Sequence, residues 1–97
     1  MELTDALDAV HGSQAFLNFV RSLIADREDE VRKEQLQPSP RFGPGANGWE
    51  NGTIEAFLSA AAAWAESSDF GLRQSLSEPT NPWHQFALFL YLGKIYE

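Results

Sequence analysis

The glycine-rich run Gly43–Gly48, GPGANG, comes closest to a known chemistry because it satisfies the G-x-G-x-x-G pattern of dinucleotide-binding loops. That chemistry also needs a preceding strand, a helix that begins at once and an acidic residue about twenty positions later. Here prolines precede the run, Trp49–Asn51 separates it from the next helix, and no βαβ pattern follows. The glycines therefore predict a turn around Trp49, and a small anion held by the amides of the loop and of Thr53 is the weaker alternative.

The remaining reactive side chains form no recognisable constellation. His11 and His84 lie in separate segments, whereas a metal site needs three or four convergent ligands. The acidic run 26–30 lacks the spacing and the glycine of a calcium loop. Glu50 and Glu55 could approach one another as an acid–base pair, but no pattern selects them, and no G-x-S-x-G elbow is present. The sequence predicts no catalytic residue, no metal ligand and no cofactor, so we expect a protein that is not an enzyme.

Length and charge narrow the class of protein further. With 97 residues we expect one helical domain, residues 1–97. Seven basic and fourteen acidic residues give a net charge of −7, which repels nucleic acid and anionic lipid, so neither is an expected partner. The chain has no cysteine, no apolar run long enough to span a membrane and no secretory leader pattern. We expect a cytoplasmic protein whose acidity mainly keeps it soluble, although a cationic partner is permitted.

The hydrophobic spacing is helical throughout and predicts an all-α fold, a small bundle of three main helices plus a short N-terminal helix. A long Pro/Gly-rich loop, pinned by Trp49, is expected to pack over this bundle. The predicted elements are a short helix 4–10, a helix 13–34 capped by Ser13, a loop 35–52, a helix capped by Thr53 that ends near Ser67, a polar connection 69–80, and a helix that begins at Asn81-Pro82 and stops at Gly93.

The longest predicted helix changes character halfway. Its apolar face comprises Phe16, Phe19, Val20, Leu23 and Ile24. Beyond that point Arg27, Glu30 and Glu34 fall on the same side, and burying an unpaired charge costs several kcal/mol. Either these last turns project into solvent, or a carboxylate holds Arg27, or the segment 26–34 is a charged arm for a partner. The i, i+4 pairs that would support a solvated end are Glu28–Arg32 and Asp29–Lys33.

The two later helices are more apolar. The predicted core stripe of the helix after Thr53 comprises Ile54, Phe57, Leu58, Ala61, Trp64 and Ala65. The last helix is apolar all round, with Leu88, Phe89 and Leu92 pointing away from its main face. Such a helix either lies at the centre of its fold or exposes a face for a homodimer or another partner.

Two segments, GPGANGWENGTIEAFLSAAAAWAE (43–66) and NPWHQFALFLYLGKIYE (81–97), carry a resemblance. The pattern joins a glycine-asparagine loop, W-E-N, a helix with F-L and W-A, N-P-W and a final G-K-I-Y-E. It resembles a family of short, mainly bacterial proteins known only as a domain of unknown function. The resemblance covers nearly the whole chain and implies a shared fold, and it brings no activity, ligand or catalytic residue.

These observations favour a non-catalytic protein-interaction module, one version of which neutralises a basic partner such as a toxin. Two alternatives stay open: a small-ligand or anion binder beneath the Phe42–Trp49 loop, with polar contacts from Asn47, Glu50 or Asn51, and a structural homodimer. The candidate binding residues are Arg27, Glu30, Glu34, Trp49, Glu50, Asn51, Leu88 and Leu92.

Overall fold

The computed structural model of this chain describes residues 2–40, 43–68 and 82–96. These residues form helices and no strand, which confirms the all-α prediction. The helices are α1 (Leu3–Asp8), α2 (Ser13–Leu36), α3 (Ile54–Ser67) and α5 (Pro82–Ile95). Phe42, the 69–80 connection and the expected cap Asn81 lie outside the described residues. No helix in the described part of the chain is both long and apolar enough to cross a membrane.

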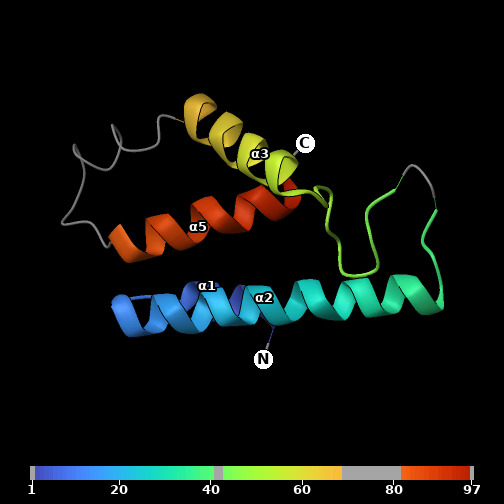
Figure 1. Cartoon of the computed structure of the whole chain (residues 1–97). Coiled ribbons are helices and arrows are strands. Elements are labelled where there is room, and N and C mark those ends of the chain that lie inside the picture. The colour runs from blue at the N-terminus through green and yellow to red at the C-terminus, as the bar shows by residue number, and fades with distance from the viewer. Residues whose placement is uncertain (1, 41–42, 69–81, 97) are drawn as a thin grey trace.

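The last helix occupies the centre of this arrangement. α5 lies between α2 and α3, and α1 packs against both α2 and α5 (Figure 1). The central position explains why α5 is apolar on all sides. Leu88 and Leu92, the residues expected at a partner face, are both partly buried, and Leu88 packs against the core. The buried core residues are Leu7, Val10, Phe19, Leu23, Trp49 and Ala87.

Small residues allow α3 and α5 to approach closely. Ala60 and Ala61 of α3 are buried, as their size predicts. The prediction that Gly93 stops the last helix is wrong, since α5 continues to Ile95. A Cβ atom added at Gly93 would lie 3.0 Å from the Phe57 ring and 3.0 Å from the Phe57 carbonyl oxygen. This glycine is therefore needed for its lack of a side chain where two helices meet, and it does not act as a helix stop.

Some of the observed helix ends are those that the sequence predicted, and others differ. The Oγ1 atom of Thr53 accepts a hydrogen bond from the amide of Ala56 at 3.1 Å, which confirms the predicted cap. Pro82 is the first residue of its helix, as expected. Ser13 is not a cap, because it is already helical and Gly12 precedes it at the cap position without a side-chain hydrogen bond. α2 also continues two residues past Glu34, to Leu36.

Three residues assigned to the core by their spacing are on the surface. Ile24, Ile54 and Leu58 retain 53%, 77% and 51% of their accessible area. The prediction is wrong here because α5 keeps α2 and α3 apart, so the sides of these two helices that face each other do not close. Exposed apolar surface therefore lies on α2 and α3, where the sequence had not suggested it, and α5 also exposes Trp83 (36%) and Phe86 (48%).

Candidate binding site

The loop between α2 and α3 is fastened to α2 by the carboxylate of Glu30. This side chain is only 2% exposed. Its Oε1 atom accepts hydrogen bonds from the amides of Asn47 (3.0 Å) and Trp49 (3.2 Å). Its Oε2 atom accepts one from Nη1 of Arg27 at 2.7 Å. The buried charge is thus compensated by one cation and two backbone dipoles, and the alternative in which a carboxylate holds Arg27 is confirmed.

Glu34 holds the other end of the same loop. Its two carboxylate oxygens accept hydrogen bonds from the amides of Ser39 (2.7 Å) and Ala46 (3.0 Å). Hydrogen bonds from Ser39, followed by the one from Ala46, hold the pKa of Glu34 below its ordinary value of 4.5. The loop amides at positions 46, 47 and 49 therefore do bind an anionic group, but that group is a carboxylate of α2 in each case.

Two glycines of the G-x-G-x-x-G run give the loop its path. The space beside Gly45 is filled by the Glu30 carboxylate, so that a Cβ atom at this position would collide with it. Gly48 has a φ of +84°, a region that other residues rarely adopt. The run is thus explained by the docking of the loop on Glu30, and the turn around Trp49 is confirmed.

Asn47 connects the loop to three further groups of α2. Its Nδ2 atom donates to the carbonyl of Asp26 and to Oδ2 of Asp29, both at 3.0 Å, and its Oδ1 atom accepts from Nζ of Lys33 at 2.8 Å. The amide of Asn47 and then the ammonium of Lys33 lower the pKa of Asp29 from its ordinary 3.8. The predicted Asp29–Lys33 pair is present at 2.9 Å, whereas Arg32 pairs with Asp29 and not with Glu28.

Trp49 is buried and joins all the main helices at one point. Its Nε1 atom donates to Oδ2 of Asp26 at 2.8 Å, and its ring stacks on Phe57 with centroids 6.0 Å apart. The cations of Arg27 and Lys94 lie 5.4 Å and 5.5 Å from the ring centroid. Nζ of the buried Lys94 also donates to Oδ2 of Asp26 at 2.6 Å. The expected docking of Trp49 on the helices is confirmed, and no sequence pattern indicated the Asp26–Lys94 pair that supports it.

The next two residues of the W-E-N motif bind the end of α5. The amide of Glu50 donates to the carbonyl of Lys94 at 2.9 Å, and the Glu50 side chain is exposed. Nδ2 of Asn51 donates to the carbonyls of Gly93 and Tyr96, both at 2.9 Å. The side-chain amide of Asn51 thus satisfies carbonyls at the C-terminal end of α5, which a helix leaves without internal partners.

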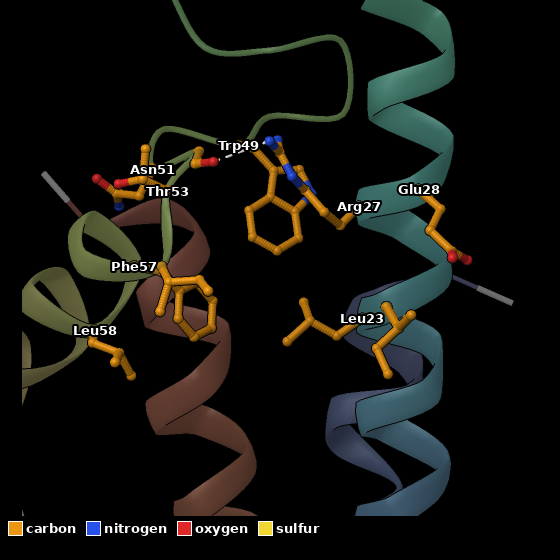
Figure 2. Close-up of a pocket in the computed structure, with 11 residues that line it drawn as sticks. Leu23, Arg27, Glu28, Trp49, Asn51, Thr53, Phe57 and Leu58 are labelled. Carbon is orange, nitrogen blue, oxygen red and sulfur yellow. Dashed lines mark hydrogen bonds between the residues drawn. The ribbon is translucent and has the colours of Figure 1, made fainter.

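A groove of about 500 Å³ opens between α2 and α3, next to this network. Figure 2 shows Trp49 and Phe57 between the two helices, with Leu23 on one side and Leu58 on the other. Nη2 of Arg27 closes one end with a hydrogen bond to the carbonyl of Gly52 at 3.1 Å (Figure 2, dashed line). The residues that line the groove are Leu23, Ile24, Arg27, Glu28, Trp49, Asn51, Gly52, Thr53, Ile54, Phe57 and Leu58.

The groove contains some of the predicted site residues and not others. Arg27, Trp49 and Asn51 border it. Glu30 and Glu34 belong to the loop contacts, and Leu88 and Leu92 lie on the central helix outside the groove lining. Ile24, Ile54 and Leu58 were missed as surface residues, because an apolar helical stripe looks the same whether or not another element covers it.

The lining of the groove is mainly apolar. Its walls are aliphatic and aromatic, and the polar groups stand at its rim. Among the residues that the structure describes, no three His, Asp or Glu side chains are grouped so that they could hold a metal ion. The arrangement favours the burial of an apolar group against Trp49, Phe57 and the exposed leucine and isoleucines.

Comparison with known proteins gives a family and no activity. The model of a family of unknown function, DUF7660, matches residues 12–97. A search of curated proteins and a search of solved structures each returned no match. The match includes α2, α3, α5 and the loop that joins α2 to α3. The chain therefore belongs to DUF7660, a family of unknown function.

Proposed function

We propose that this protein is a non-catalytic protein-interaction module that binds an amphipathic helix in the groove between α2 and α3. The observation that carries the proposal is the exposure of Ile24, Ile54 and Leu58 around one groove that is also lined by the rings of Trp49 and Phe57. Burial of apolar surface contributes roughly 25 cal/mol of stabilising free energy per Å², and the exposed part of each side chain does not make this contribution. Contiguous apolar patches of this kind mark interaction sites, and helices commonly dock in apolar grooves between helices.

The form of the groove favours a helix over a small molecule. A volume of about 500 Å³ would accommodate a drug-sized ligand, but such sites usually bury about 70–90% of the ligand surface. Ile54 and Leu58 remain largely in solvent, so this groove is open along its length. An elongated partner with its own apolar stripe covers such a surface better than a compact ligand does.

The charges at the rim specify the partner further. Glu28 lines the groove and is exposed, and Glu55 is exposed on the first turn of α3. A bound helix should therefore carry a basic residue beside its apolar stripe. Within the proposed charged arm, 26–34, Arg27 binds Glu30, and Glu30 and Glu34 each bind amides of the loop. Their engagement supports the groove as the binding surface in preference to the arm. A cytoplasmic location, which a chain without cysteine would suit, is part of this proposal.

The proposal can be tested with a synthetic probe. A fluorescein-labelled helical peptide with leucines at three- and four-residue spacing and flanking lysines is titrated with the protein, and the anisotropy is recorded. A peptide with the same composition in scrambled order is the control ligand. We expect the amphipathic peptide to bind and the scrambled one to bind at least about tenfold more weakly, since only a continuous stripe fills the groove.

Matched variants locate the binding surface. Leu58→Glu places a charge in the groove, whereas Leu36→Glu makes the same change at an exposed leucine that does not line it. Leu58→Glu should weaken binding by at least about tenfold, and Leu36→Glu should leave it unchanged. Equal affinities of these two variants for the peptide would contradict the proposal.

A further inference from the structure

α2 carries a second apolar feature that runs along the outer edge of the groove. Leu17, Ile24 and Val31 retain 46%, 53% and 41% of their accessible area. They are spaced by seven residues, which in an α-helix returns each side chain to within about 20° of the same direction. The helix has 24 residues and is about 36 Å long, so the stripe follows most of its exposed side.

Two charged residues flank this stripe on the same side. Arg21 and Glu28 are both exposed and are also seven residues apart. If two copies of α2 packed in parallel, the two-fold axis would run along the helices and would place Arg21 and Glu28 of the two copies on opposite sides of the seam, where they could not pair. If they packed antiparallel about a two-fold axis at Ile24, Arg21 would face Glu28 of the second copy, and this contact would occur twice. The charge pattern therefore complements itself only in the antiparallel arrangement.

The apolar residues show the same self-complementarity. With the two-fold axis at Ile24, Leu17 of one copy meets Val31 of the other, and Ile24 meets its own counterpart. An interface in which one patch pairs with itself in this way is the usual basis of a symmetric dimer. Ile54 and Leu58, which line the groove next to Ile24, would widen the buried area.

We infer that the amphipathic helix bound at this surface is α2 of a second copy of the chain, packed antiparallel with its two-fold axis near Ile24. This inference rests on the proposed function and names its partner. A bound helix is expected to carry a basic residue near the exposed Glu28, and Arg21 of the second copy is such a residue. Each chain has a net charge of −7, so the two reciprocal Arg21–Glu28 contacts also offset part of the repulsion between the copies.

Mass in solution gives the first test. Sedimentation equilibrium over a range of concentrations should show a mass that rises from 10.8 kDa toward twice that value. Ile24→Glu should remain at the monomer mass, and the control Leu36→Glu should associate like the unmodified chain. Ile24 and Leu36 are both exposed, so neither change should prevent folding. A monomer at every concentration, or an Ile24→Glu variant that still dimerises, would overturn the inference.

Single cysteines test the geometry, because the chain has none of its own. Ile24→Cys should form a disulfide-linked dimer on mild oxidation, since this position lies on the proposed axis. Leu17→Cys and Val31→Cys should each stay unlinked alone and should link to one another when the two variants are mixed. Self-linking of Leu17→Cys without linking to Val31→Cys would indicate parallel helices and would refute the antiparallel arrangement.

Charge reversal at Arg21 tests the proposed Arg21–Glu28 pairing, and exchange of both charges should restore dimerisation. Arg21→Glu replaces both attractive contacts by repulsive ones and should weaken dimerisation by about tenfold. The double variant Arg21→Glu/Glu28→Arg should restore it, because the two charges are exchanged. A single variant that dimerises normally, or a double variant that stays weak, would contradict the charge pairing.

The outcome also separates this inference from the proposed function. Arg21 does not line the groove, so the Arg21→Glu variant keeps the surface that the synthetic peptide would bind. A chain that is monomeric under all conditions and yet binds the amphipathic peptide would refute self-association and leave the helix-binding function in place. A monomer that binds neither peptide would refute both.

Discussion

Nζ of Lys94, near the end of α5, lies 2.6 Å from Oδ2 of Asp26 in the middle of α2, and the same oxygen accepts the indole N–H of Trp49 at 2.8 Å. One carboxylate oxygen thus joins α2, α5 and the loop. The Lys94 side chain is almost fully buried, so its charge depends on Asp26 for compensation.

Lys94→Met should therefore destabilise the protein by about 3 kcal/mol, because it leaves the Asp26 carboxylate without its cation. The measurement is urea unfolding followed by circular dichroism. The double variant Asp26→Asn/Lys94→Met should lose less than the sum of the two single changes, since no unpaired charge then remains. Strictly additive losses would show that the pair contributes little as a pair.

Gly45→Ala should destabilise the protein by about 2 kcal/mol. The added Cβ atom would occupy the position of the Glu30 carboxylate, which is buried and held by three hydrogen bonds. Gly43→Ala is the matched control, because nothing lies within 4 Å of a Cβ atom at that position. Unfolding midpoints should separate the two variants, and similar midpoints would mean that the loop moves away from Glu30 at little cost.

Gly93→Ala should change the stability of the protein through two opposing effects. Alanine favours a helix over glycine by about 1 kcal/mol, but the new methyl group would press on the ring and the carbonyl of Phe57. The carbonyl is backbone and cannot turn aside, so we expect a net loss of about 1 kcal/mol in thermal or urea unfolding. Gly43→Ala, whose Cβ atom would meet nothing within 4 Å and which is outside the helices, is the control. A stabilised Gly93→Ala protein would indicate that α3 and α5 separate easily.

The neighbours Leu23 and Ile24 should respond differently to truncation. Leu23 is buried in the core, so Leu23→Ala should cost about 3 kcal/mol. Ile24 is about half exposed, so Ile24→Ala should cost less than about 1 kcal/mol in dilute protein. Urea unfolding of both variants at low protein concentration checks this difference, and equal losses would place Ile24 in the core.

Acid should weaken the attachment of the loop. The pKa values of Glu34 and Asp29 are lowered in the folded protein, by hydrogen bonds from Ser39 and from Asn47 respectively. The stability that they contribute is fully present above their ordinary values of 4.5 and 3.8, and it is lost as the pH falls through the lower folded values. The urea midpoint should therefore drop below about pH 4.5.

Glu34→Gln separates the contribution of this residue from the rest. The variant cannot gain a proton at position 34, so its midpoint should be lower than that of the unmodified protein at neutral pH and should fall less steeply in acid. The same pH profile in both proteins would show that the contacts of Glu34 add nothing to stability.

Much of the fold could be predicted from local patterns. Thr53 and Pro82 carry signals for helix starts that act within a few residues, and both are observed. The bulk of Trp49 and the glycines before it predicted a loop that turns back and docks. Such features depend on the conformational preferences of adjacent residues, and these preferences are present in the sequence itself.

The groove and the contacts beside it could not be predicted in the same way. Glu30 is buried because amides 17 and 19 residues later reach it, and Lys94 is buried because Asp26 lies 68 residues away in sequence but next to it in space. Gly93 lies inside α5, and the ring and carbonyl of Phe57 take up the space that a side chain at this position would need. Each outcome depends on which surfaces meet, and periodicity shows only that a surface is apolar.

The sequence by itself determined a small all-α protein with a docked tryptophan loop, since helical spacing, caps and turn residues act locally. The tertiary structure decided that α5 would be central and that Ile24, Ile54 and Leu58 would stay exposed. The physical reason is that burial is a property of pairs of elements. The helix that separates α2 from α3 leaves part of their apolar stripes uncovered, and this uncovered part is the candidate binding surface.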